Sequence, residues 1–236
     1  MRVTLVVPMI LAGLPALAGS FTPPAACTAF LTVQARGCYV ANYYKCEADT
    51  PGDQWRADFD QEGLFYLARI DRETQWVESL DIGPQVAQVL DANPVDPASF
   101  SGLLSTGYDS FTFGLTKDDG GHSTVRGFDR LTGKKVVIDG IALEQTEFEF
   151  TETDDAGTVL RQARGNEYIH ANWRLFFSGQ SKWPQEDGSV REVEGSPVQF
   201  IQPGEPGFAS TQPIFECDVV TSSLPQSLRS LGHDNL

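Results

Sequence analysis

Residues 111–130 read FTFGLTKDDGGHSTVRGFDR, and this stretch decides the fold. In its first half, apolar side chains alternate with small or polar ones, which is the period of a strand with one buried face. The apolar residues are Phe111, Phe113 and Leu115. The turn sequence DDGG at residues 118–121 follows, and residues 123–130 return as a second strand. The stretch therefore predicts a β-hairpin.

Similar strand and turn patterns fill most of the chain. The further predicted strands are residues 38–48, 55–60, 64–70, 75–82, 134–138, 141–152, 159–169 and 173–178. Because turns rather than helices join most of them, they predict a mainly β, antiparallel domain and not a parallel α/β fold. A sheet of about ten strands tends to curl or to split in two. We therefore expect a curved antiparallel sheet or half-barrel of about ten strands, with a β-sandwich as the alternative.

One predicted strand carries charges on its second face. Trp55, Ala57 and Phe59 alternate with Arg56, Asp58 and Asp60. This alternation predicts a hairpin strand with one buried face, made by the aromatic and alanine side chains.

Two segments have helical spacing instead. Residues 22–37 begin with a capping Thr22 and Pro23 and end at Gly37, so they predict a short N-terminal helix, which we place against the concave face of the sheet. Residues 84–91 carry apolar side chains at helical spacing and predict a helical crossover within a single domain.

The first residues read MRVTLVVPMILAGLPALAGS. Arg2, an apolar stretch and the sequence ALA at residues 16–18 predict a signal peptide, residues 1–18, cleaved after Ala18. The apolar run is shorter than a membrane-spanning helix requires and is interrupted by prolines. Lipidation of Cys27 is disfavoured because Pro24 occupies a position where lipoproteins carry leucine. We expect residues 19–236 to form a single β-rich domain exported to the bacterial periplasm, with an extracellular location as the alternative.

Four cysteines, Cys27, Cys38, Cys46 and Cys217, remain in the exported part and predict two disulfides. On one continuous strand Cys38 and Cys46 would lie about 26 Å apart, and Cys27 and Cys38 at the two ends of the helix would lie about 16 Å apart. Both distances are too long for a disulfide. The remaining pairing is Cys27 with Cys46 and Cys38 with Cys217. A turn at residues 41–42 would instead pair Cys38 with Cys46 and Cys27 with Cys217.

The charge balance excludes several kinds of partner. The chain has 17 Lys and Arg residues against 32 Asp and Glu residues, a formal net charge of −15. A nucleic-acid binder needs a basic face, and a protein of the membrane surface needs clustered basic residues. The acidic balance favours solubility and cationic partners. After the leader no apolar segment is long enough to span a bilayer, so we expect no integral membrane protein.

Catalytic motifs are absent from the sequence: it contains no G-x-S-x-G, H-E-x-x-H, P-loop or G-x-G-x-x-G pattern. His122 and His170 are the candidates for a hydrolytic triad, although the first reads as a hairpin residue and the second as a turn or core residue. Three widely spaced histidines and no C-x-x-C pattern argue against zinc and redox chemistry. The sequence leans against catalysis and suggests no cofactor or metal.

Acidic side chains cluster on one strand and at two turns. Phe148 and Phe150 are predicted to face inward, so Glu147 and Glu149, which alternate with them, share the opposite face and read as solvent-exposed rather than as a glycosidase pair. The carboxylates at residues 118–119 and 154–155 lack EF-hand spacing and read as hairpin turns.

The four tryptophans bear on binding. Trp55, Trp76 and Trp173 lie in apolar patterns and are expected in the core, whereas Trp183, before Pro184 in a polar stretch, is expected to be exposed and to contact a ligand. A curved sheet offers an apolar concavity, so we expect a binding or carrier protein for a lipid or another apolar or amphiphilic molecule. The alternatives are a structural or assembly factor that binds another envelope protein through a sheet edge, and a hydrolase with an unrecognised site.

Overall fold

The computed structural model describes residues 19–185 and 187–217. The predicted signal peptide and the end of the chain, residues 218–236, lie outside the described residues. The elements are β1 (Cys27–Ala35), β2 (Tyr39–Cys46), β3 (Gln54–Asp60), β4 (Gly63–Ile70), β5 (Trp76–Asp81), β6 (Val86–Leu90), α1 (Phe100–Thr106), β7 (Tyr108–Lys117), β8 (His122–Ile138), β9 (Ile141–Asp154), β10 (Val159–His170), β11 (Leu175–Pro184), β12 (Val190–Glu194) and β13 (Pro197–Ile201).

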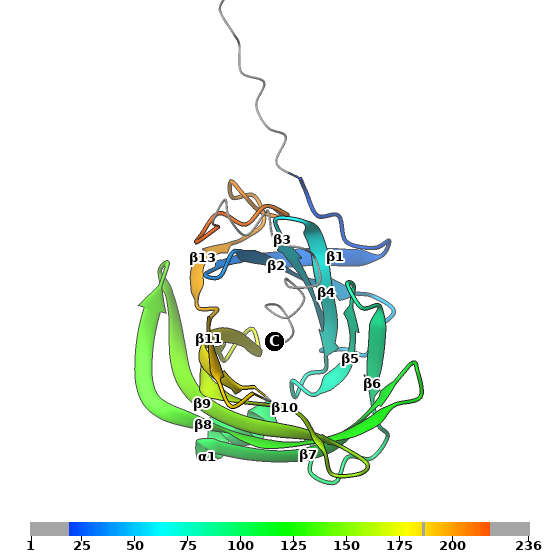
Figure 1. Cartoon of the computed structure of the whole chain (residues 1–236). Coiled ribbons are helices and arrows are strands. Elements are labelled where there is room, and N and C mark those ends of the chain that lie inside the picture. Colours follow the sequence, from blue (N-terminus) through cyan, green and yellow to red (C-terminus); the bar gives the residue numbers. More distant parts are fainter. Residues whose placement is uncertain (1–18, 186, 218–236) are drawn as a thin grey trace, which may run out of the picture.

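All thirteen strands belong to one antiparallel sheet, in the order β12-β11-β10-β9-β8-β7-β6-β5-β4-β3-β2-β1-β13. The mainly β class and the curved antiparallel sheet are therefore confirmed, while the sandwich alternative and the count of about ten strands are wrong. Figure 1 shows this sheet rolled around an interior, with β2–β6 facing β8–β11.

The two edge strands of the sheet are consecutive in the chain. β12 pairs with β11, β13 pairs with β1, and Gly195 and Ser196 join them. The Gly195 N–H donates to the carbonyl of Gly179 (3.0 Å), and the Arg36 N–H donates to the carbonyl of Ser196 (3.0 Å). The sheet is not closed into a continuous ladder, but this short connection holds its two ends together.

The hairpin of β8 and β9 is longer than its sequence predicts. The sequence predicts separate strands over residues 123–130 and 134–138 with a turn between them at residues 131–133, yet β8 continues through this segment, and its pairing with β9 shifts register between Leu131 and Lys135. Such a shift absorbs extra residues as a bulge and bends the strand. At Asp139-Gly140 the sequence predicts a turn or a bulge, and the hairpin turns there: both residues have positive φ (47° and 77°), which a two-residue type I′ turn requires. Its tip reaches β13, where the Phe200 N–H donates to Asp139 Oδ2 (2.9 Å).

Both predicted helices are wrong. Residues 27–35 form β1, and after a register shift between Ala29 and Leu31 its residues alternate: Leu31 and Val33 face inward, and Thr32 and Gln34 face outward. Residues 86–90 form β6, paired with β5 and β7. In both segments sheet pairing outweighs a local helical pattern that was only weakly specified.

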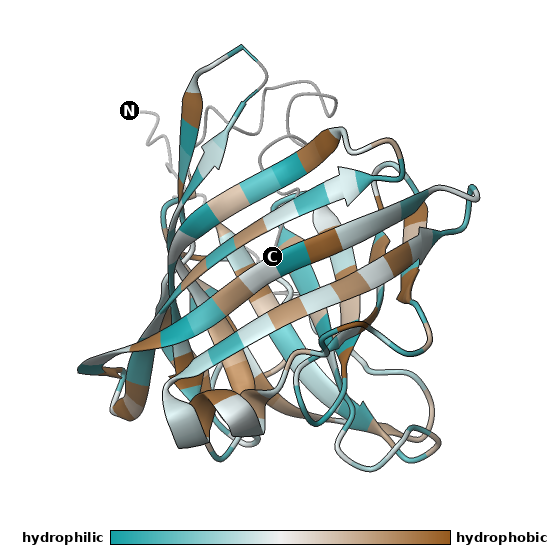
Figure 2. Cartoon of the chain, turned by 90° about the horizontal axis from the view of Figure 1, so that it is seen from below, coloured by the Kyte–Doolittle hydropathy of each residue, from teal (hydrophilic) through white to brown (hydrophobic). Residues whose placement is uncertain are grey.

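The one helix of the described residues, α1, lies where none was predicted. In α1 the Ser99 side chain accepts the Gly102 N–H (3.0 Å), and Gly107 ends the helix with a φ of 82°. Phe100 and Leu103 are buried against Ile169. Figure 2 shows α1 at one end of the strands, along which hydrophobic and hydrophilic residues alternate.

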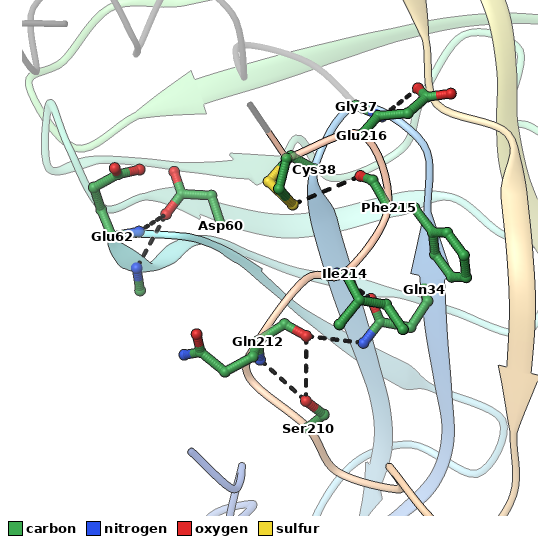
Figure 3. Close-up of a disulfide and its surroundings, with 12 residues drawn as sticks. Gln34, Gly37, Cys38, Asp60, Glu62, Ser210, Gln212, Ile214, Phe215 and Glu216 are labelled. Carbon is green, nitrogen blue, oxygen red and sulfur yellow. Dashed lines mark hydrogen bonds between the residues drawn. A yellow bond between two sulfur atoms is a disulfide. The ribbon is translucent and has the colours of Figure 1, made fainter. Parts of the chain in front are cut away.

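Segments outside the sheet cover the outer face of β1–β3. The Ala209 N–H donates to Thr32 Oγ1 (2.8 Å), and Asn42 Nδ2 donates to the carbonyl of Ser210 (2.9 Å). Figure 3 shows Gln34 held in the same way: its Nε2 donates to the carbonyl of Gln212 (2.9 Å), and its Oε1 accepts the Ile214 N–H (3.2 Å). From the N-terminal side, the Phe21 ring packs on Tyr44 at 5.5 Å. The middle of β2 is consequently buried on both faces.

The disulfides join Cys27 to Cys46 and Cys38 to Cys217. Cys27 and Cys46 are directly opposite each other in the pairing of β1 with β2. These are the two pairs that the spacing argument left, although the helix on which it rested does not exist: β1 and β2 are antiparallel strands joined by a turn at residues 36–38. Two disulfides fit an oxidising compartment. Among the described residues, no helix has the length and apolar character needed to cross a membrane.

Candidate ligand-binding cavity

Two adjoining cavities lie inside the rolled sheet. The aromatic cavity, of about 170 Å³, is lined from β3–β7 and β8–β11. The adjoining cavity, of about 310 Å³, lies between β2–β4 and β9–β12. Tyr66, Phe148, Glu167 and Ser178 border both. Small-molecule sites are concave, mostly apolar and carry a few placed polar groups, and these cavities have that character.

Four rings from four strands form the wall of the aromatic cavity. Trp76 on β5 contacts Phe113 on β7 (5.3 Å between centroids) and Phe150 on β9 (5.8 Å). Phe150 in turn contacts Trp183 on β11 (5.8 Å). All three contacts are edge-to-face, an arrangement that adds to the stabilisation from burial. The inward orientation that alternation predicted for Phe113 and Phe150 is confirmed.

The expected exposure of Trp183 is wrong. Its side chain is 5% exposed, and its indole N–H donates to Ser181 Oγ (2.9 Å). The polar stretch around it is the outer face of β11, where Lys182 pairs with Glu192 (2.9 Å). Ser181 and Trp183 lie on the opposite, inner face. Trp183 therefore borders the aromatic cavity from within.

The charged side chains of β3 also point in the direction opposite to the one expected. Arg56 and Asp58 were assigned to the face opposite the buried one, but they point into the interior. Arg56 stands opposite Tyr43 in the pairing of β2 with β3, and its Nε lies 3.0 Å from Asp58 Oδ2. The apolar face of Ala57 and Phe59 instead packs outward against Phe21. Both faces of β3 are thus covered.

Two further carboxyls, Asp129 on β8 and Glu167 on β10, face the same interior. We call Arg56, Asp58, Asp129 and Glu167 the polar centre. Glu167 keeps some accessible surface because it borders both cavities. Within the described residues, neither Asp129 nor Glu167 has a hydrogen-bond or ion-pair partner at its carboxyl group.

Burial has the largest effect on the pKa values of the three carboxyls in the polar centre. It raises the pKa of Asp58 to about 6 against the opposing effect of Arg56. Burial, and then the charge of Asp109, raises the pKa of Asp129 to about 7. The pKa of Glu167 lies well above its usual value because of burial and of Asp129, with Arg56 acting in the opposite direction. Removing charged groups from water disfavours their ionised forms.

Two buried acceptors along the inner face of β3 have no donor. Gln54 and Asp58 are 3% and 2% exposed. Gln54 Oε1 and Asp58 Oδ1 have no hydrogen-bond partner, although Gln54 Nε2 donates to the carbonyl of Trp173 (3.0 Å). Gln54 lines the aromatic cavity and Asp58 the adjoining one. An unpaired buried polar group costs about 1–3 kcal/mol, so these oxygens mark places where a donor belongs.

Polar contacts join α1 to two neighbouring turns of the sheet. Glu73, in the turn between β4 and β5, accepts the Ser101 N–H (2.8 Å), the Ser101 hydroxyl (2.8 Å) and Arg174 Nη2 (2.8 Å). Burial would raise the pKa of Glu73, but these bonds outweigh it and the pKa is lowered. The Arg174 guanidinium also lies 4.9 Å from the centre of the Phe100 ring. The turns after β4 and β10 are thereby tied to the helix.

The two candidate histidines lie outside the polar centre. His122 Nδ1 is 2.6 Å from Asp155 Oδ1, and its Nε2 is 2.8 Å from Asp91 Oδ2. Hydrogen bonding to Asp155, then to Asp91, raises the pKa of His122. An imidazole held by carboxylates at both nitrogens has no nitrogen left to activate a serine, unlike the histidine of a hydrolytic triad. His170 Nδ1 accepts the Trp173 N–H (3.1 Å), and burial lowers its pKa.

The other acidic candidates have local partners. Glu147 pairs with Arg130 and Glu149 is exposed, as expected for an outer face. Asp154 and Asp119 accept backbone N–H groups of their own hairpin turns. No group of three or more His, Cys, Asp or Glu side chains in the described part of the chain is arranged to hold a metal ion.

An assembly factor would need an uncharged sheet edge, and the two edge strands differ in charge. β12, the edge strand beside β11, has five residues, of which Arg191, Glu192 and Glu194 are charged, whereas β13, the edge strand beside β1, has five residues and no charge, although it begins with a proline. Short, charged edges discourage the addition of another strand.

The polar centre was missed because charged side chains in an alternating strand normally face water. One signal was present: residues 39–44 read YVANYY, and a strand with almost no polar positions is covered on both faces. Its neighbour β3 would then have two covered faces as well. Comparison of the chain with models of known protein families, with curated proteins and with solved structures found no match.

Proposed function

We propose that the protein is a periplasmic binding or carrier protein that holds a small apolar or amphiphilic ligand inside its rolled sheet. The observation that carries the proposal is the aromatic cavity, walled by Trp76, Phe113, Phe150 and Trp183 and bordered by buried polar groups. Aromatic walls with a few convergent polar side chains are the general character of small-molecule sites. The predicted signal peptide and the two disulfides support an exported location.

The two kinds of wall favour an amphiphile over a purely apolar molecule. The aromatic rings provide a large apolar contact area, while Glu167 and Ser178 border the same space at its junction with the adjoining cavity. A molecule with an apolar body and one polar group would satisfy both walls at once.

Native mass spectrometry of the oxidised protein, purified from a periplasm without detergent, tests whether a ligand is captured. A discrete added mass that is lost on denaturation is the expected result. In parallel, the delipidated protein is titrated with N-phenyl-1-naphthylamine, a neutral apolar fluorophore. We expect saturable binding that quenches tryptophan emission, because Trp76 and Trp183 line the cavity.

A cavity-filling variant locates the binding. Ala68 lines the aromatic cavity from β4, so Ala68→Phe should weaken binding of the fluorophore by about tenfold or more, as about 1.4 kcal/mol or more of binding energy is lost. Ala142→Phe, at an exposed position of β9, is the matched control and should bind normally. A folded Ala68→Phe variant that binds as tightly as the control would contradict the proposal.

A further inference from the structure

We propose that the ligand carries a protonated amine, which lies against Asp58, Asp129 and Glu167 while the apolar part of the ligand occupies the aromatic cavity. This inference rests on the proposed function and names the chemical class of its ligand. It follows from the charges, the unpaired acceptors and the geometry of the cavity junction.

The polar centre has more carboxyls than cations. It contains one guanidinium, Arg56, beside three carboxyls, and Arg56 lies directly against Asp58. The other arginines that line the aromatic cavity have acidic partners of their own. Arg161 pairs with Glu152, and Arg69 pairs with Asp53 (2.8 Å) and Glu78 (2.7 Å). Asp129 and Glu167 therefore have no basic partner in contact within the described part of the chain, and in their ionised forms they attract a cation.

Two unpaired groups on the inner face of β3 accept hydrogen bonds. Gln54 Oε1 and Asp58 Oδ1 lack donors among the described residues, and the ionised carboxyls of Asp129 and Glu167 would accept as well. Asn166 Nδ2, on the wall of the adjoining cavity, is an unpaired donor. An ammonium group has three N–H donors and no acceptor, so it supplies the donors that the two oxygens and the two carboxyls lack. A ligand carboxylate has only acceptors and would add a fourth negative charge beside the three carboxyls.

The junction of the two cavities is the place for the ammonium group. Glu167 borders both cavities, Asp129 borders the aromatic one and Asp58 the adjoining one. The rings of Tyr66 and Phe148 also border both. Aromatic faces attract cations, most strongly where water is excluded. An ammonium group at this junction thus meets carboxyls and ring faces together, and its alkyl chain points toward Trp76 and Trp183.

Three probes of equal chain length separate charge from apolar contact: octylamine, octanol and octanoate. Each is titrated into the oxidised, delipidated protein at about pH 8, where aliphatic amines are protonated, with tryptophan emission and calorimetry as readouts. We expect octylamine to bind at least about tenfold more tightly than octanol, and octanoate to bind most weakly. Octanoate or octanol binding as tightly as octylamine would overturn the amine proposal alone. Failure of all three probes to bind would overturn the proposed function with it.

Charge-neutral variants place the amine. Glu167→Gln keeps the shape of the side chain, and it should reduce octylamine affinity about tenfold while leaving octanol affinity unchanged. Glu149→Gln, on the outer face of neighbouring β9, is the control and should change neither affinity. Near-ultraviolet circular dichroism verifies that both variants are folded. An unchanged preference for octylamine in both Glu167→Gln and Asp129→Asn would show that the amine does not lie at the polar centre.

Discussion

Arg56 Nε and Asp58 Oδ2 lie 3.0 Å apart on the inner face of β3, and the Asp58 side chain is 2% exposed. Two charges in such a place cost desolvation energy that their attraction only partly returns. The pair therefore contributes little to stability. Removing only one partner is costly mainly because the other charge is then left buried without a counter-ion. The pair borders the same interior as two half-buried carboxyls, Asp129 and Glu167, and this position assigns it to the cavity rather than to the core.

Removing one member of this pair should destabilise the protein far more than removing both. Arg56→Met leaves Asp58 without its cation and is expected to cost about 3–5 kcal/mol in the free energy of unfolding. Arg56→Met combined with Asp58→Leu should recover most of that loss. Urea unfolding at about pH 8 measures both.

The exposed pair Lys135–Glu144, 3.1 Å apart on β8 and β9, is the control. Lys135→Met should change stability by less than about 1 kcal/mol, as surface pairs do. Equal losses from Arg56→Met and from the double variant would contradict the burial of the pair.

The free energy of unfolding should fall as the pH rises from about 4 to about 7. The pKa of Asp129 is raised to about 7 in the folded protein, so the folded state holds a proton that the unfolded chain has released above about pH 4. Ionisation then opposes folding between about pH 4 and about pH 7, by at most about 4 kcal/mol for this group. Glu167 acts in the same direction.

Denaturant unfolding at a series of pH values measures this dependence in wild type and in Asp129→Asn with Glu167→Gln. The double variant should show a flatter profile. Asp58 and His122, whose pKa values are also raised, contribute in the same direction and remain in both proteins. A profile equally steep in the double variant would assign the whole dependence to other groups.

His122 should titrate above its ordinary pKa of about 6.5. Asp155 and Asp91 bond its two ring nitrogens, so its charged form gives stability that is present below about pH 6.5 and is lost as pH rises through the folded pKa. The side chain is 35% exposed, so solvent keeps this contribution small. Proton NMR of the ring measures the pKa directly. Asp155→Asn should lower it, whereas Glu149→Gln should not.

The predictability of this fold depends on which faces of its strands meet water. Alternation located Phe113 and Phe150 correctly, because the outer faces of β7 and β9 carry polar residues. It misassigned Arg56 and Asp58 because segments remote in sequence, including Phe21, cover the other face of β3. Residues 22–37 were misassigned because pairing with β2 and β13 outweighs a local helix signal. Contacts with segments that are remote in the sequence leave no pattern in the local sequence, so these two features could not be predicted from it.

The two disulfides should contribute unequally. Cys38–Cys217 spans 179 residues and Cys27–Cys46 spans 19. The loss of chain entropy in the unfolded state alone predicts a stabilisation of about 5 kcal/mol from Cys38–Cys217 and about 3 kcal/mol from Cys27–Cys46. The longer link also fastens residues 209–217 over β1 and β2, where Gln34 is held by Gln212 and Ile214. Guanidinium unfolding of the two paired Cys→Ser variants compares them, and a greater loss at Cys27–Cys46 would contradict this order.

Gly127 allows the aromatic ring of Phe111 to lie over β8. It stands opposite Phe111 on β7 and Phe150 on β9. A Cβ atom at this position would lie 2.7 Å from the Phe111 ring and 2.3 Å from the Glu149 carbonyl oxygen. Neither the ring wall nor the backbone of β9 can withdraw without disturbing the aromatic cavity. Gly127→Ala should therefore cost about 1–3 kcal/mol, the usual range for overpacking.

Gly83→Ala is the control for that substitution, because no atom lies within 4 Å of its added Cβ. It should change the free energy of unfolding by less than about 0.5 kcal/mol. Ligand titration adds a second readout: displacement of Phe111 should weaken N-phenyl-1-naphthylamine binding in Gly127→Ala and leave it unchanged in Gly83→Ala. A Gly127→Ala variant that is as stable as the control and binds the probe normally would contradict this prediction. It would show that the Phe111 ring is not tightly packed against β8.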